Sequence, residues 1–169
     1  MTSFISALGR DQLFFWRLDR KRHASTWESG EGAFRAGGRW NSVGTRCVYC
    51  SLEPSTAILE VAVHIGFAAL NATPHVLTKA RITAPSALHI CKRDEIPNAN
   101  WLVPGATSVG QQSFGDGLLT LHKFVALPSV VSPSSWNLIF MPSSAISNYV
   151  LEEQSPFALD PRLDPLPAP

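Results

Sequence analysis

Apolar residues recur along this chain mainly in short runs, and the spacing of these runs predicts strands more often than helices. Residues 75–82 (HVLTKARI) alternate loosely between apolar and polar positions, as in a strand with one buried face. Other runs have a comparable length and are bounded by turn-forming residues. We therefore expect an α+β fold dominated by short strands, at residues 46–51, 75–82, 86–91, 123–131 and 136–141.

The clearest helix signal covers residues 54–66. Pro54 suits the first turn of a helix, and Gly66 suits its C-terminal end. Ile58, Val61, Ala62 and Ile65 form an apolar stripe between them. A second helix is expected over residues 113–122, although Gly115 and Gly117 weaken the pattern.

The remaining segments carry weaker signals. Residues 12–18 are apolar and aromatic, which fits an early strand or a short helix, and residues 20–32 are polar and irregular. Residues 93–112 contain the prolines and glycines typical of loops. The proline-rich end, DPRLDPLPAP, is expected to fray. With no repeat and no linker, we expect one domain over residues 1–169, with its core at about 13–163.

Composition indicates what kind of partner and ligand the protein has and in which compartment it works. Only 16% of the residues are charged, which favours a chain that covers part of its surface with a partner or a second copy. Residues 1–50 hold eight basic and four acidic side chains, which suits a small anionic ligand or an acidic peptide. No leader-like start and no apolar run of about 18 residues is seen, and the three cysteines are an odd number, so we expect a cytoplasmic protein.

Arg39 is the first candidate for chemistry because it follows two glycines in the segment GGRWN. Its planar guanidinium could grip a phosphate while Gly37 and Gly38 let the backbone approach. The alternative is an ordinary surface turn with a solvated arginine. The segment is neither a P-loop nor a GxGxxG fingerprint, so no recognised phosphate loop applies.

Tyr49 and Glu60 offer an aromatic ring and a carboxylate nearby. Tyr49 is either a core tyrosine or a stacking surface for a flat ring. Glu60 lies within the apolar run AILEVAVHI, either at the edge of the buried face or in a cleft, because an unpaired buried charge is costly. His64 shares its helix face, and without an HExxH motif we expect no metal.

Two further features have alternative explanations. Ser129, in LPSVV, could cap a turn or face a ligand, and no Gly-x-Ser-x-Gly elbow supports a serine hydrolase. Cys47 and Cys50 form a CxxC within an expected strand, where positions three apart point to opposite faces. We expect ordinary half-buried cysteines at both positions.

Taken in order, these motifs resemble the RES domain, found in toxins of RES–Xre type II toxin–antitoxin pairs. The similarity extends from about Trp16 to Leu163, and one departure is Met141-Pro142-Ser143-Ser144, where the family usually has Asn-Pro followed by a His. The segments that carry the resemblance are Trp16-Arg17, GGRWN (Gly37 to Asn41), Gly44, Tyr49, Ser51, Leu59-Glu60, His64, Trp101, Gly115-Asp116, Pro128-Ser129 and SPFALDPRL.

The resemblance implies a fold like that of ADP-ribosyltransferases and a reaction that breaks the nicotinamide–ribose bond of NAD⁺, the expected substrate. Arg39, Tyr49 and Glu60 would be catalytic, with Glu60 stabilising an oxocarbenium-like centre and Arg39 neutralising the pyrophosphate. Tyr49 would stack on nicotinamide or the adjoining ribose. The implied substrate-binding residues are Arg17, Gly38, Trp40, Asn41, Ser51, His64 and Ser129.

Three functional hypotheses follow. The first is a toxin that depletes NAD⁺ by hydrolysis or phosphorolysis, and the second is a protein ADP-ribosyltransferase with a specific target. The third is a catalytically weak binding module, motivated by the Met141 departure. The resemblance also implies an Xre-like antitoxin that covers the Arg39 pocket and a homodimer within the complex. No membrane contact is expected, and nucleic acid would be reached only through the antitoxin.

Overall fold

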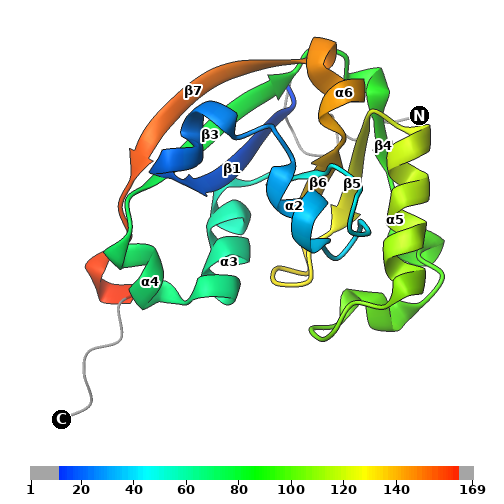
Figure 1. Ribbon diagram of the computed structural model, residues 1–169, viewed down its shortest axis with the longest axis horizontal. Coiled ribbons are helices and arrows are strands. Elements are labelled where there is room, and N and C mark those ends of the chain that lie inside the picture. The colour runs from blue at the N-terminus through cyan, green and yellow to red at the C-terminus, as the bar shows by residue number, and fades with distance from the viewer. Residues whose placement is uncertain (1–11, 164–169) are drawn as a thin grey trace.

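The computed structural model describes residues 12–163, which build a single seven-stranded sheet in the order β4-β5-β6-β2-β1-β3-β7 (Figure 1). Neighbouring strands are antiparallel except for the parallel pair β4 and β5. The strands are β1 (Phe14–Arg20), β2 (Val48–Ser51), β3 (His75–Ile82), β4 (Leu88–Ile90), β5 (Phe124–Pro128), β6 (Trp136–Phe140) and β7 (Tyr149–Phe157).

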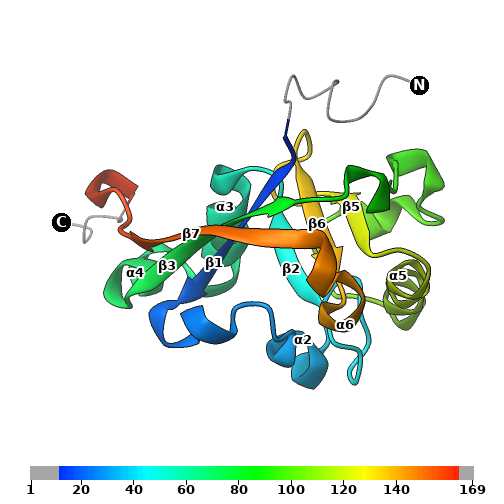
Figure 2. The same cartoon turned by 90° about the horizontal axis from the view of Figure 1, so that it is seen from above.

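Helices pack on this sheet and fill the connections between strands (Figure 2). None of them, within residues 12–163, is long and apolar enough to cross a membrane. The α-helices are α2 (Glu31–Ala36), α3 (Pro54–Ile65), α4 (Phe67–Ala72), α5 (Val109–Leu121) and α6 (Pro142–Ala145). The 3₁₀ helices are η1 (Lys21–Thr26), η2 (Pro85–Ala87), η3 (Arg93–Glu95), η4 (Ala99–Leu102), η5 (Ile146–Asn148) and η6 (Pro161–Leu163).

The core divides along the two faces of the sheet, as strand alternation requires. Phe124 and Ala126 of β5 belong to one buried cluster with Phe15 of β1, whereas Val125 and Leu127 belong to a second cluster on the other face. A third cluster joins β1 to α3 and α4. The second and third clusters share no residues.

Strands β1 and β2 separate soon after they meet. Only Trp16 and Ser51 are paired between them, whereas β2 keeps four register pairs with β6. The Arg17 guanidinium donates to the carbonyl oxygen of Tyr49 at 2.6 Å. The separation thus leaves part of the β2 edge unpaired inside the sheet, and the Arg17 side chain forms a hydrogen bond to it.

Several expectations about secondary structure are confirmed. Helix α3 begins at Pro54 and ends before Gly66, whose φ of 78° lies in the left-handed region that favours glycine. Strand β3 covers the predicted residues 75–82. Residues 12–18 belong to a strand rather than a short helix.

Other expectations were wrong. Strand β7 follows the strand expected to be the last, and residues 20–32 contain η1 and the start of α2 instead of irregular chain. Helix α5 begins at Val109, four residues early, because the Ser108 hydroxyl accepts the Gln111 N–H and caps the helix. The expected fraying concerns mainly residues 164–169, which lie outside the described residues.

The three cysteines are buried free thiols in separate places. Cys50 and Cys47 lie in clusters on opposite faces of the sheet, as their spacing predicted, although they are fully rather than half buried. Burial raises the pKa of Cys50 to about 12 from its ordinary 9.0, and burial also raises the pKa of Cys47.

We expect the free energy of unfolding to fall as the pH rises above 9. The folded chain keeps thiol protons that the unfolded chain releases, so each such thiol contributes a loss of about 1.4 kcal/mol per pH unit. Urea unfolding between pH 8 and 10.5 measures the slope. Cys50→Ala should reduce the slope by the contribution of about one proton. A flat profile in the wild-type chain would contradict the raised thiol pKa values.

Candidate active site

A cleft with two lobes lies on the sheet face between the second and third clusters. The lobes have volumes of about 430 Å³ and 800 Å³, and both are lined by Tyr49, Glu60, His64 and Asn137. We call the first the Arg17 lobe and the second the Arg39 lobe, each after an arginine that lines it. These volumes are in the range of small-molecule sites, and Glu60 lies where the lobes meet.

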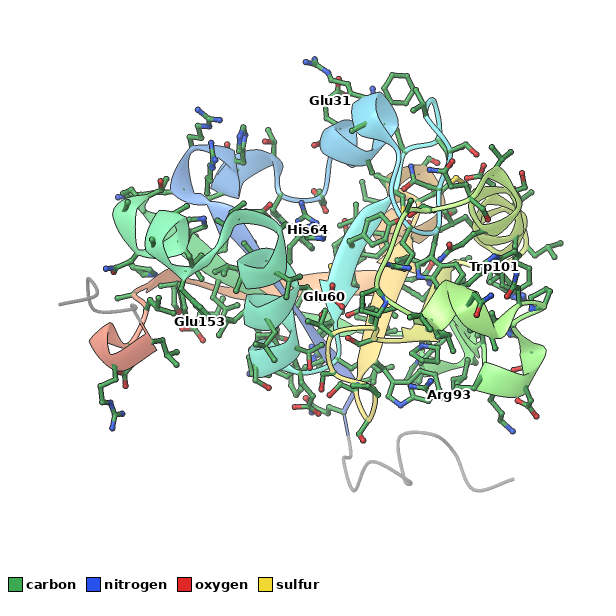
Figure 3. All side chains as sticks on the ribbon, turned by 90° about the horizontal axis from the view of Figure 1, so that it is seen from below. Glu31, Glu60, His64, Arg93, Trp101 and Glu153 are labelled. Atoms are coloured by element: carbon green, nitrogen blue, oxygen red, sulfur yellow. The ribbon has the colours of Figure 1, made fainter. Side chains whose placement is uncertain are left out.

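Glu60 is placed by helix α3, which lies across the sheet with its apolar stripe on β1. Ala62 is buried in the third cluster, with Ile58 and Val61 packed against it, so Glu60 is turned toward the strands. Figure 3 shows Glu60 and His64 on the part of α3 that faces strand β2. His64 is exposed and lines both lobes.

One carboxylate oxygen of Glu60 is held by two donors. Its Oε1 accepts the Ser129 hydroxyl at 2.9 Å and the Asn137 amide at 2.5 Å. Ser129 in turn accepts the N–H of Ser132 at 3.1 Å. Among the described residues no donor bonds to Oε2, so this second oxygen is available to a ligand in the cleft.

Tyr49 presents its ring to both lobes while its hydroxyl is held by the protein. The hydroxyl accepts the Trp40 N–H at 2.9 Å and donates to Asn41 Oδ1 at 2.8 Å. Burial raises the pKa of the Tyr49 phenol above its ordinary value. The Tyr49 ring therefore forms a flat side of the cleft, and its hydroxyl holds Trp40 and Asn41 in place. The phenol does not act as an acid or base near neutral pH.

Replacing Tyr49 by Phe should lower the free energy of unfolding by about 1–3 kcal/mol. The change leaves the Trp40 N–H and the Asn41 Oδ1 without their partner in a buried place. Urea unfolding measures the loss. A double-mutant cycle with Asn41→Ala should show coupling, and strict additivity would contradict the shared bond.

Arg39 projects from a tight turn that closes between Gly38 and Asn41. The N–H of Gly38 donates to the carbonyl oxygen of Asn41 at 3.0 Å. The Arg39 guanidinium donates to the carbonyl oxygen of Trp101 at 3.1 Å, and no described carboxylate forms an ion pair with it. Its positive charge is therefore available to an anion in the Arg39 lobe.

Arg17 differs from Arg39 because a carboxylate already binds it. Its Nε and Nη2 donate to the two oxygens of Asp19 at 2.7 and 2.9 Å, in addition to the bond from Nη1 to Tyr49. Three of its five N–H groups are thus used within the protein. Arg17 still lines its lobe, with 27% of its side chain exposed.

The other candidates from the sequence divide into lining and supporting residues. Gly38 and Trp40 line the Arg39 lobe, and Ser51 lines the Arg17 lobe. Asn41 is fully buried, with its amide nitrogen within hydrogen-bond distance of three carbonyl oxygens, and its Oδ1 accepts the Tyr49 hydroxyl, so it braces Tyr49. Ser129 is 1% exposed and contacts Glu60 instead of the open cleft.

Steric contacts explain why residue 38 is a glycine. An ideal Cβ there would lie 2.5 Å from the Tyr49 hydroxyl oxygen and 2.7 Å from Asn41 Oδ1. A side chain would displace the bond that fixes the aromatic wall, so glycine keeps the turn and the ring in contact.

Two residues near the site were missed or differ from expectation. Asn137 was not singled out, yet it lines both lobes and binds Glu60; a polar residue inside the apolar strand WNLIF was its only signal. Met141, the departure from the family pattern, packs against the second cluster and lines neither lobe. Within residues 12–163, no three His, Cys, Asp or Glu side chains gather as a metal site would require.

Comparisons with known proteins match this architecture. A crystal structure of the MbcT–MbcA toxin–antitoxin complex of M. tuberculosis superposes with a TM-score of 0.66 at 18% identity, over 87% of this chain and 85% of that one. The likeness concerns the fold, and together with the seven-stranded sheet it confirms the predicted α+β class. The protein thus has the fold of that class, with a carboxylate at the centre of its cleft.

Sequence relatives give the family. The RES domain family model matches residues 14–160. A "Toxin Res" from Yersinia enterocolitica is 30% identical over 156 residues, which cover 89% of this chain and 99% of the relative. The "Prs ADP-ribosylating toxin" of Sphingobium sp. is 30% identical over 142 residues, or 76% of this chain and 82% of the relative. The chain belongs to the RES domain family.

Proposed function

We propose that this protein is the toxin of a toxin–antitoxin pair and that it cleaves the nicotinamide–ribose bond of NAD⁺. The observation that carries the proposal is Glu60, whose Oε1 is held by Ser129 and Asn137 while Oε2 receives no bond from the described residues. Relatives of similar length carry the name "Toxin Res", which supports the toxin role.

The arrangement of the cleft suits this bond. Nicotinamide leaves as a neutral molecule from a cationic ring, so the site needs a negative charge beside the developing oxocarbenium centre more than a strong acid. Glu60 supplies that charge, and the ring of Tyr49 supplies a surface for a flat group. Arg39, which has no described carboxylate partner, binds the pyrophosphate.

Water, phosphate or a protein could receive the ADP-ribose. Hydrolysis or phosphorolysis is the first candidate, because the small Arg17 lobe opens beside Glu60 and admits a small acceptor. The name of the Sphingobium relative, an ADP-ribosylating toxin, supports transfer to a protein as the second. Products from labelled NAD⁺ separate them, because label in free ADP-ribose or its phosphate indicates the first and label on protein indicates the second.

The direct test is nicotinamide release by the purified protein, freed of any co-purified partner, with NAD⁺ in the presence and absence of phosphate. Release well above that of a buffer blank is the expected result. Binding of NAD⁺ without release, under every acceptor condition, would instead support the binding-module hypothesis and overturn the proposal.

We further propose an antitoxin that covers the Arg39 lobe, in keeping with the toxin–antitoxin complex that shares this fold. An Xre-like protein with an acidic or carboxylate-bearing segment would complement Arg39. A homodimer of the toxin within the complex remains part of this proposal. Unimpaired NAD⁺ turnover in the saturated complex would contradict coverage of the cleft.

Arg39→Ala should raise the KM for NAD⁺ by about 10- to 100-fold, since a bond to a charged group is lost. The matched control is Arg35→Ala, because Arg35 is exposed and pairs with Glu31 outside both lobes. That control should keep its KM within about twofold. Equal effects of the two substitutions would remove Arg39 from the substrate site.

A further inference from the structure

Asn137 stands at the centre of a row of side chains that crosses the sheet beneath Glu60. In the strand register Ser51 of β2 lies directly opposite Asn137 of β6, and Leu127 of β5 lies opposite it on the other side. Residues opposite each other in a ladder lie close enough for their side chains to meet. The position of Asn137 is thus fixed by two neighbouring strands, on a rigid part of the fold.

The hydrogen bonds around Asn137 have a defined direction. A carboxylate only accepts hydrogen bonds, so the amide nitrogen of Asn137 must face Glu60, where it donates at 2.5 Å. The amide oxygen then faces Ser51 and accepts its hydroxyl at 2.9 Å. Ser51 is 2% exposed, so this bond is shielded from water and holds the amide in one orientation.

From this chain of bonds we propose that Asn137 is the positioning residue that selects which oxygen of Glu60 acts. Ser51 orients the amide, the amide holds Oε1, and Oε2 is left to meet the ligand. The inference rests on the proposed NAD⁺ cleavage, because it assigns the working atom of that reaction.

Asn137 and Ser129 both bind Oε1, but they occupy different places. Ser129 is 1% exposed, lies behind the carboxylate and lines neither lobe. Asn137 lines both lobes, so its amide stands on the cleft side of Glu60. Loss of the amide would free the carboxylate to rotate toward the cleft, whereas Ser129 would remain behind it as an anchor.

The test compares Asn137→Ala and Asn137→Asp in nicotinamide release across pH. Asn137→Ala should lower kcat by about 10- to 100-fold with KM within about threefold, because the substrate still binds but the carboxylate is misplaced. Asn137→Asp keeps the shape and places a second carboxylate beside Glu60. Two such groups share a proton, so the acid limb of the pH profile should move up by about one unit or more.

Two further variants complete the experiment: Ser51→Ala, and a control substitution at an exposed asparagine. Ser51→Ala should give a smaller loss of kcat than Asn137→Ala, since the amide then turns but is still present. Asn100→Asp is the matched control, because Asn100 is exposed and lines neither lobe, and its pH profile should stay that of the wild type. A wild-type pH profile in Asn137→Asp, or an unchanged kcat in Asn137→Ala, would overturn the inference.

An NMR measurement tests Asn137 without relying on activity. In the wild-type chain one proton of the Asn137 side-chain amide should resonate downfield, and Glu60→Ala should return it to the ordinary range. An ordinary shift in the wild-type chain would overturn the inference even if NAD⁺ is cleaved. A wild-type protein that shows the downfield proton but releases no nicotinamide would instead reject the proposed function alone.

Discussion

Glu60→Gln should lower the rate of nicotinamide release by at least about 1,000-fold while the protein remains folded. The amide oxygen of the glutamine can take the place of Oε1 and keep the bonds from Ser129 and Asn137. Its nitrogen then takes the place of Oε2 in the cleft. A neutral donor thus replaces an acceptor where positive charge develops, and the transition state loses its stabilisation.

The isosteric change separates charge from packing. Because the two bonds to Oε1 are kept, the urea midpoint of the Glu60→Gln variant should stay close to that of the wild type. Glu153→Gln is the matched control, since Glu153 is exposed on β7 and lines neither lobe. Nicotinamide release by high-performance chromatography gives both rates. A Glu60→Gln variant within about tenfold of the wild-type rate would show that the charge is not central to the chemistry.

The sequence predicted local structure best where the signal was local. Helix α3 was predicted to within a residue because Pro54 and Gly66 mark its ends and its apolar stripe is regular. That helix fixes the face on which Glu60 lies. Arg39 could be proposed from its two preceding glycines, and the turn between Gly38 and Asn41 shows the geometry behind that pattern.

The missed features depend on contacts between distant segments. Strand β7 (YVLEEQSPF) is exposed along most of its length and pairs only with β3, so it lacks the alternation that marks a half-buried strand. The bond between Ser51 and Asn137 joins residues 86 positions apart. It depends on the register of β2 against β6, which no local pattern specifies.

Several residues that were expected to bind the substrate form hydrogen bonds within the protein instead. Asn41 and Ser129 were expected at the substrate, yet one braces Tyr49 and the other holds Glu60. Arg17 was expected to bind the substrate, and in the structure Asp19, two residues later in the same strand, already pairs with it. Side chains that look suited to a ligand are therefore partly used to hold Tyr49 and Glu60 in place.

Gly115→Ala should lower the free energy of unfolding by about 3 kcal/mol. At this position α5 packs directly on the backbone of the turn that carries Arg39. An ideal Cβ on Gly115 would lie 2.1 Å from the carbonyl oxygen of Trp40 and 2.6 Å from its carbonyl carbon. Because these are backbone atoms, no side-chain rotation can relieve the overlap, and the helix and the turn must move apart.

That movement has consequences for the site. The Asp116 carboxylate accepts the N–H of Ser42 at 3.1 Å, and the Gln112 amide donates to the carbonyl oxygen of Gly38 at 3.0 Å. Both bonds join α5 to the turn on either side of Arg39. Separating the two elements should therefore raise the KM for NAD⁺ as well as reduce stability.

Gly117 provides the matched control on the same helix. It is exposed, and a Cβ there would meet no atom within 4 Å, so Gly117→Ala should stabilise the protein by about 0.5–1 kcal/mol through the lower conformational entropy of the unfolded chain. Urea unfolding of the two variants should thus shift in opposite directions. Equal stability of Gly115→Ala and Gly117→Ala would show that α5 does not lie against the Trp40 backbone. The position of the turn that carries Arg39 would then no longer be explained by its contact with α5.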